Sequence, residues 1–160
     1  MELKLSKHYE VRKLGINDID MIYEMCRENT IFYQYHPPFV TRESIREDMS
    51  ALPPGKNYQD KYYVGFFENE QLAAIMDLIL KYPNDETALI GLFMTNVQFQ
   101  RKGVGSAIIN ELLICLKEIG YKKIRIGVDK GNPQSNSFWA KNGFVPTGEK
   151  NDYIVMERTI

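Results

Sequence analysis

The pattern of hydrophobic and polar residues changes its period after residue 55. Before that point apolar positions recur mainly at helical spacing, and beyond it aromatic and aliphatic runs alternate as strands. The first part begins with a predicted strand over residues 8–13. A helix follows as far as about Glu28, and either Asn17 or Asp18 is placed to cap it.

An aromatic segment interrupted by prolines, residues 32–39, separates this helix from the next and is predicted to be a loop. Thr41 begins the second helix, whose first turns carry acidic residues, as the positive end of a helix dipole favours. Pro53-Pro54-Gly55 ends this helical part of the chain.

Three strands are predicted next. Residues 62–67 and 72–80 are apolar runs joined by Glu68-Asn69-Glu70, which is typical of a hairpin. A turn over residues 82–85 leads into a third run, residues 87–94. These three strands are expected to form an antiparallel meander.

The period becomes helical again over residues 103–119, and Gly120 is placed to end that helix. Ile124, Ile126 and Val128 then alternate as a strand. A strand, a helix and a second strand in this order predict a right-handed crossover between parallel strands.

A last helix begins at Asn132-Pro133, with asparagine as the cap and proline in the first turn, and ends at Asn142-Gly143. Residues 144–147 and 153–158 complete the sheet as two closing strands. The expected fold is therefore a single domain over residues 1–160, of mixed α/β class. Its central sheet is mostly antiparallel with one βαβ crossover, and helices cover both faces.

Composition narrows the classes of function. Lys and Arg number 20 against 21 for Asp and Glu, so no basic field attracts nucleic acid or an anionic membrane. No apolar stretch approaches the length of a membrane span, and the first residues do not resemble a signal peptide. Two cysteines and two histidines offer no zinc-type spacing. We therefore expect a cytoplasmic protein with reduced thiols, no metal, no nucleic acid partner and no membrane partner.

The segment with the clearest chemistry runs from Gln100 to Ser106, between a strand and the long helix. A helix start presents unpaired backbone N–H groups and partial positive charge, so a glycine-containing turn there can bind a pyrophosphate. Arg101 and Lys102 add charge, and Gln100 either donates to the ligand or braces the loop. The alternative is an ordinary turn that needs glycine only for its geometry. The spacing matches neither a Walker loop nor the dinucleotide-binding motif.

Two motifs in register resemble the GNAT superfamily of N-acetyltransferases. The first is Gln100-x-x-Gly103-x-Gly105, and the second joins Asn132 to an aromatic pair in the last helix and then to Gly143-Phe144. The resemblance covers the chain from about Tyr62 to its end. It implies acetyl-coenzyme A as co-substrate and an amine as acceptor.

The resemblance also implies roles for individual residues. Phe93, Met94 and Thr95 would pair with the pantetheine arm, and a backbone N–H of Met94 or Thr95 would polarise the thioester carbonyl. Asn132 and Asn136 would hydrogen-bond the arm, although Asn132 also serves as a helix cap. The remaining cofactor contacts would come from the pyrophosphate loop and from groove packing, which involve Gln100, Arg101, Lys102, Gly103, Val104, Gly105, Ser106 and Trp139.

Glycines occur inside two predicted strands, where they cost stability unless something approaches closely. Gly127 lies in a strand that parts from its parallel neighbour in this family, and Gly91 could mark a bulge that helps the parting. For both residues, a simple packing role is the alternative.

An amine acceptor must lose a proton before it can attack a thioester. The carboxylate candidates for this step are Asp77, within an apolar run, and Glu86, at the start of the third meander strand. Either could instead bind a cationic substrate. Many family members have a tyrosine acid where this chain has Trp139. Indole cannot replace it, and Tyr153, Ser137 or water remain open as substitutes.

The aromatic segment 32–39 is the expected wall of the acceptor site, since Tyr33, Tyr35 and His36 offer π faces to a cation. The alternative is that these rings form a small core of their own. The acceptor is expected to be an amine of a small molecule or a peptide, and a homodimer is left open. Two other functions compete with acetyl transfer: a non-catalytic acyl-coenzyme A sensor, and transfer of a longer acyl group.

Overall fold

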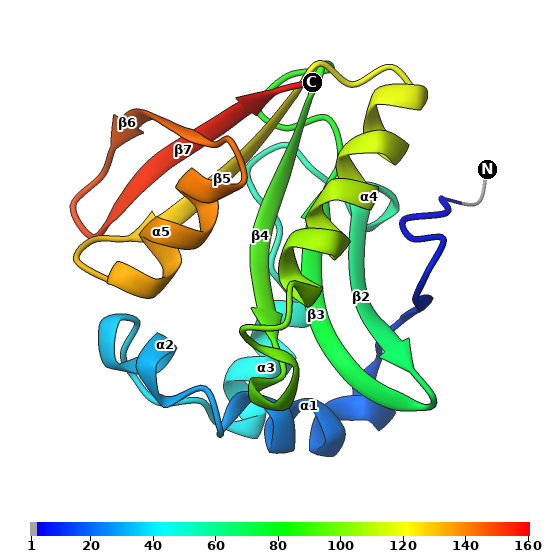
Figure 1. Ribbon diagram of the computed structural model, residues 1–160, viewed down its shortest axis with the longest axis vertical. Coiled ribbons are helices and arrows are strands. Elements are labelled where there is room, and N and C mark those ends of the chain that lie inside the picture. The colour runs from blue at the N-terminus through cyan, green and yellow to red at the C-terminus, as the bar shows by residue number, and fades with distance from the viewer. Residues whose placement is uncertain (1–2) are drawn as a thin grey trace.

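A computed structural model describes residues 3–160. These residues form one seven-stranded sheet with helices packed on both faces (Figure 1). The strand order is β1-β2-β3-β4-β5-β7-β6, and every neighbouring pair is antiparallel except β4 and β5. The predicted mixed sheet with one parallel crossover is therefore confirmed. The strands are β1 (Glu10–Lys13), β2 (Lys61–Glu68), β3 (Gln71–Ile79), β4 (Thr87–Thr95), β5 (Lys123–Asp129), β6 (Val145–Glu149) and β7 (Tyr153–Thr159). The helices are α1 (Ile19–Cys26), α2 (Thr30–Tyr35), α3 (Arg42–Ser50), α4 (Val104–Glu118) and α5 (Pro133–Lys141).

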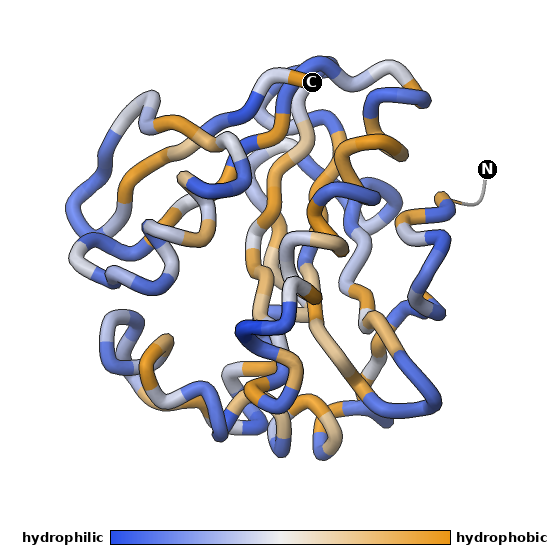
Figure 2. The backbone as a smooth tube through the Cα atoms, viewed as in Figure 1, coloured by the Kyte–Doolittle hydropathy of each residue, from blue (hydrophilic) through white to orange (hydrophobic). Residues whose placement is uncertain are grey.

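Two hydrophobic clusters lie on opposite faces of the sheet. The larger one joins the buried residues of α4 and Trp139 of α5 to one face, and the smaller one joins α1 and α3 to the other. Figure 2 shows the apolar segments concentrated along the central strands and α4. This arrangement explains why β3 is an almost continuous apolar run, because both of its faces are covered.

Several element boundaries agree with the capping chemistry. Thr41 accepts a hydrogen bond from the backbone N–H of Ser44 at the start of α3, and Asn132 does the same for Ser135 at the start of α5. Gly120 follows α4 with a φ of 105°, a left-handed conformation in which glycine avoids strain. These predicted helix ends are confirmed.

Two expectations need correction. The aromatic segment is not wholly a loop, because its first half belongs to the helix α2. The second concerns the buried face of α4. Helical spacing over residues 103–119 predicts one buried face made of Val104, Ala107, Ile108, Leu112, Cys115, Leu116 and Ile119. The observed buried face also includes Ile109 and Leu113 and leaves Ala107 exposed, because neighbours cover α4 on a wider stripe than this set of positions.

Candidate active site

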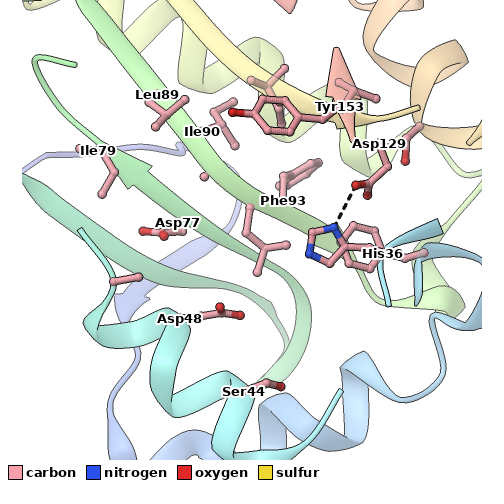
Figure 3. A pocket seen from close by; sticks show the side chains of 18 of the residues that line it. His36, Ser44, Asp48, Asp77, Ile79, Leu89, Ile90, Phe93, Asp129 and Tyr153 are labelled. Atoms are coloured by element: carbon pink, nitrogen blue, oxygen red, sulfur yellow. Dashed lines mark hydrogen bonds and ion pairs between the residues drawn. The ribbon is translucent and has the colours of Figure 1, made fainter. Parts of the chain in front are cut away.

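A cavity of about 610 Å³ opens where β4 and β5 part (Figure 3). The two strands pair from Thr87 with Lys123 to Ile90 with Ile126, and the pairing stops there. Beyond that point the cavity is lined by both strands, by α2 and α3, by the end of β3 and by Tyr153 of β7. The parting of the two parallel strands therefore opens this cavity.

A β-bulge at Gly91 marks the point of parting. Along the β3–β4 ladder Asp77 pairs with Leu92 and Leu78 pairs with Ile90, so Gly91 has no partner. A Cβ atom on Gly91 would lie 3.0 Å from Oδ2 of Asp77. The predicted bulge is confirmed, and the missing side chain leaves room for the Asp77 carboxylate.

Gly127 follows Ile126, the last residue of β5 that pairs with β4, and allows an aromatic ring to lie close to the strand. A Cβ atom there would lie 2.9 Å from Cδ2 of Tyr153, whose ring lines the cavity. The glycine therefore has a packing role, which was one of the two alternatives drawn from the sequence.

The segment from Gln100 to α4 forms a tight turn with two residues in left-handed backbone. Arg101 has a φ of 62° and Gly103, the N-cap of α4, has a φ of 79°. The first backbone donor to the helix is Ala107, which bonds to the carbonyl of Gly103. The N–H groups of Val104, Gly105 and Ser106 precede it and have no carbonyl within the helix to bond to. Such a set of N–H groups suits an anion.

Gly105 is also needed for the packing of α4 against α5. A Cβ atom at this position would lie 3.0 Å from Cε1 of Phe138, so the glycine lets α4 and α5 pack closely. Arg101 and Lys102 are both exposed beside the turn. The turn therefore combines exposed cations, glycine geometry and unpaired N–H groups at one helix start.

Gln100 braces this turn. Its side-chain amide donates to Oδ1 of Asn29 at 2.8 Å and to the carbonyl of Thr95 at 3.0 Å. Because Asn29 is buried between α1 and α2, the turn is tied to the helices on the other side of the sheet. Of the two roles that the sequence left open for Gln100, these bonds support the brace.

The free edge of β4 is defined by the hydrogen bonds at its end. The N–H of Asn96 bonds to Ala73 of β3 at 2.8 Å, and the carbonyl of Thr95 points the other way, to Gln100. Alternation along a strand then directs the N–H of Met94 to β3 and those of Phe93 and Thr95 to the opposite side. Thr95, rather than Met94, is therefore the better-oriented of the two donors proposed for a thioester carbonyl. The side chain of Met94 lies in the smaller hydrophobic cluster.

Asn132 carries a buried amide with one unused group. It is completely buried, its Oδ1 caps α5, and its Nδ2 has no hydrogen-bond partner. Asn136 differs, because its Nδ2 already donates to the carbonyls of Asp129 and Asn132. Burying an unpaired amide costs free energy, so Asn132 fits a ligand acceptor and Asn136 serves mainly to hold the turn.

Trp139 is 5% exposed and lines the cavity. Its ring packs edge-on against Phe93, Phe138 and Phe144, with centroid distances of 6.0, 5.0 and 4.9 Å. The residue is therefore part of an aromatic wall that supports the parted end of β4.

Asp77 lies on the cavity wall in a buried ion pair. Its Oδ2 accepts a hydrogen bond from Nζ of Lys61 at 2.8 Å, and Lys61 also donates to the carbonyl of Ala51. Oδ1 of Asp77 is buried and has no partner. Burial raises the pKa of Asp77 from its usual value, and the hydrogen bond and charge of Lys61 oppose that shift.

A second carboxylate, Asp48 of α3, faces the same cavity (Figure 3). The side chain of Asp48 is exposed. Partial burial by the surrounding protein nevertheless raises the pKa of Asp48, and the negative charge of Asp77 raises it further. The described residues provide no salt bridge to Asp48, whereas Asp77 is balanced by Lys61. The wall of the cavity that Asp48 lines therefore has negative character.

Glu86 lies elsewhere. It is exposed in the turn before β4, and its carboxylate is 3.2 Å from Nζ of Lys122. Of the two carboxylates proposed from the sequence, the fold brings Asp77 to the cavity and leaves Glu86 outside its lining.

His36, just after α2, reaches across the open end of the cavity to β5. Its Nδ1 is 2.9 Å from Oδ1 of Asp129, and its ring stacks on Phe32 at a centroid distance of 5.1 Å. The hydrogen bond to Asp129 raises the pKa of His36, and the charges of Asp129 and Asp48 act in the same direction, against a smaller opposing effect of burial.

The aromatic segment lies on the cavity wall and also makes contacts within itself. Phe32, Tyr33 and His36 line the cavity, while the rings of Tyr33 and Phe39 also contact each other at 5.3 Å. Tyr35 is absent from the cavity lining, and its ring lies near Gly131 instead. The helical turn of α2 explains this, because it directs neighbouring side chains to different sides.

Sequence reasoning did not find Lys61, Asp48 or Asp129. Lys61 opens an apolar strand, which was the one available signal that a lysine is buried there. Asp48 and Asp129 carry no local signal, because each is an ordinary acidic residue near the end of an element. Their roles depend on contacts between distant parts of the chain.

Within residues 3–160 no group of three or more His, Cys, Asp or Glu side chains is arranged to hold a metal ion. In the same part of the chain, no helix is long and apolar enough to cross a membrane.

The sequence of the chain matches a known protein family. The model of the acetyltransferase (GNAT) family matches residues 20–144. Since this match spans most of the chain, the protein belongs to the GNAT family of acetyltransferases. The resemblance seen in the two sequence motifs is confirmed.

Individual relatives are distant. The chain is 23% identical over 157 residues to the spermidine N(1)-acetyltransferase of Thermoplasma acidophilum, covering 93% of this chain and 96% of that protein. An acetyltransferase structure from Thermus thermophilus has a TM-score of 0.81 at 17% identity, with 95% and 97% of the two chains covered. The PaiA N-acetyltransferase of Thermoplasma acidophilum, solved with coenzyme A, has a TM-score of 0.73 at 20% identity, with 95% and 99% covered. These structures share the fold.

Proposed function

We propose that this protein transfers the acetyl group of acetyl-coenzyme A directly to a primary amine of a small molecule or a peptide. The observation that carries the proposal is the parting of β4 from β5 beside the start of α4. A ligand that passes between the strands would meet main-chain donors on one side and a negatively charged cavity on the other.

The residues on the cofactor side fit a pantetheine and a pyrophosphate. Nδ2 of Asn132 is a buried donor without a partner, which suits an amide carbonyl of the pantetheine arm. The N–H groups of Phe93 and Thr95 face the same opening. The unpaired N–H groups of Val104, Gly105 and Ser106 suit the pyrophosphate, and Arg101 and Lys102 add charge.

The acceptor side favours a cation. Asp48 and Asp77 face the cavity, and Phe32 and Tyr33 add aromatic surface. The distant relative from Thermoplasma acidophilum is named for spermidine, which agrees with an amine acceptor.

The test of cofactor binding is calorimetry with coenzyme A on Lys102→Glu and a matched control. Lys102 is exposed at the start of α4, so reversing its charge should weaken binding about 10-fold, the size expected for loss of one charged contact to phosphate. Lys117→Glu, in the last turn of the same helix, changes the same charge far from the proposed pyrophosphate. It should leave the affinity unchanged. Equal effects of both variants, or no heat with well-folded wild-type protein, would contradict the cofactor site.

Catalysis is tested by thiol release from acetyl-coenzyme A with a panel of primary amines. The aromatic burial of Trp139 favours a second candidate function, a coenzyme A sensor, because no hydroxyl is present there to protonate a leaving thiolate. Tight binding without thiol release for any amine would support the sensor. A faster reaction with succinyl- or longer acyl-coenzyme A would instead support transfer of a longer acyl group.

A further inference from the structure

A histidine and an aspartate from distant parts of the chain meet at the open end of the cavity. His36 follows α2 and Asp129 ends β5, and 93 positions separate them. An ionised carboxylate can only accept a hydrogen bond. The 2.9 Å contact between Nδ1 of His36 and Oδ1 of Asp129 therefore requires Nδ1 to carry the hydrogen. Nε2 is then the basic nitrogen of the neutral imidazole.

Figure 3 shows the orientation of this basic nitrogen. The imidazole directs one nitrogen to Asp129, and its other nitrogen is turned toward the middle of the cavity, on the side of Phe93 and Asp48. The stack on Phe32 and the hydrogen bond to Asp129 together fix the plane of the ring. The geometry is that of an oriented base facing the space assigned to the acceptor.

The other candidate for this step is less suited to it. Asp77 is already bonded to the buried Lys61, and the two opposite charges form a neutral pair. If Asp77 took up a proton, it would become neutral. The buried ammonium of Lys61 would then have no partner charge, at a cost in free energy. His36 has no such partner on Nε2 among the described contacts.

We propose that His36, oriented by Asp129, is the general base that deprotonates the acceptor ammonium. This inference rests on the proposed function. Asp129 is a positioning residue, since it acts through the imidazole. Asp48, which has no salt bridge among the described residues, keeps the role of attracting the ammonium group.

The protons balance in the reaction. The acceptor ammonium gives one proton to Nε2 of His36, and the free amine nitrogen then forms a bond to the acetyl carbon. The bond between carbon and sulfur breaks, and the sulfur takes its electron pair. The imidazolium returns its proton to the sulfur, and the second proton leaves the new amide nitrogen for water.

The charged groups around His36 set the pH at which it can act. Asp129 on β5 and Asp48 on α3 both face the ring and favour its charged form. The Lys61–Asp77 pair lies beyond Asp48 and changes the charge balance that Asp48 experiences. The base should therefore become active as pH rises through a pKa above the ordinary value for histidine.

The experiment compares the pH dependence of kcat and kcat/KM for wild type, His36→Gln and Asp129→Asn. His36→Gln should lower kcat about 100-fold or more, the usual contribution of a general base, and should abolish the acid limb of the profile. Asp129→Asn should move that limb to lower pH, because it removes the charge that raises the pKa of His36. The affinity for coenzyme A, measured by calorimetry, should be unchanged in both.

The chain offers a matched control and an independent readout. His8, the second of its two histidines, is exposed near the N-terminus and outside the cavity lining, so His8→Gln should leave the profile unchanged. With only two histidines, NMR titration assigns each imidazole by comparison of the two variants. His36 should titrate above the ordinary histidine pKa of about 6.5, and Asp129→Asn should lower the pKa of His36.

Three results would overturn the proposal by itself. The first is an acid limb that persists in His36→Gln, and the second is a His36 resonance whose pKa does not change in Asp129→Asn. A loss of rate in His36→Gln that is equal at every pH would also overturn it, since that is the mark of a structural role. A wild-type protein that binds coenzyme A but acetylates no amine would instead overturn the proposed function and this inference together.

Discussion

The two sides of the parted strands are built in different ways. The proposed cofactor side consists of three short segments: the end of β4, the turn before α4 and the start of α5. Its donors are backbone N–H groups and the amide of one helix cap. The acceptor side is assembled from α2, α3, β2, β3 and β5, through the Lys61–Asp77 and His36–Asp129 pairs. Local backbone geometry determines the first side and long-range contacts determine the second. Changes to the buried Lys61–Asp77 pair should therefore affect folding, whereas changes on the cofactor side should affect binding.

The largest effect is expected from Lys61→Met. The side chain of Lys61 is 4% exposed, and its removal leaves Asp77 as a buried charge without a partner. Breaking such a pair typically costs about 3–5 kcal/mol of the free energy of unfolding. Urea denaturation at neutral pH measures the loss.

The control for that prediction is the double variant Lys61→Met with Asp77→Leu. It replaces both charges by apolar groups and should recover most of the lost stability, since an apolar pair can replace a buried ion pair. A single variant as stable as the wild type would mean that water reaches the pair, and the proposed difference between the two sides would lose its main support.

Asn132→Ser should separate binding from folding on the cofactor side. Serine can still cap α5, but it lacks the amide donor that Nδ2 provides. Affinity for coenzyme A should fall about 3- to 10-fold, as expected for one hydrogen bond, with little change in the melting temperature. Asn132→Ala removes the cap as well and should lower both quantities. If Asn132→Ser bound coenzyme A as tightly as the wild type, Nδ2 would not be a ligand donor.

The smallest effect concerns the pH dependence of stability. Because the pKa of His36 is raised in the folded state, its contribution is fully present below the ordinary value of about 6.5. The contribution is lost as pH rises through the higher value of the folded protein. Wild type should therefore lose more stability than His36→Gln between pH 6 and pH 8, as measured by thermal melting. Parallel curves for the two proteins would show that the contact between His36 and Asp129 does not stabilise the fold.

The turn before α4 shows both the strength and the limit of sequence reasoning. The sequence alone predicted its glycines, its cations and its position at the start of a helix. The order of strands around it also predicted that β4 and β5 are parallel. The packing role of Gly105 could not be predicted from the sequence, since its contact with Phe138 depends on how α4 and α5 pack. A local pattern identifies a backbone geometry but not every neighbour that requires it.

The sequence by itself determined four of the five helices, most strands and the family, because these depend on periodicity, capping and short motifs. The tertiary structure alone decided that Lys61 neutralises Asp77, that Glu86 lies outside the cavity, and that His36 meets Asp129. The physical reason is distance along the chain. Burial and charge pairing are properties of neighbours in space, and the neighbours of these side chains come from other strands and helices.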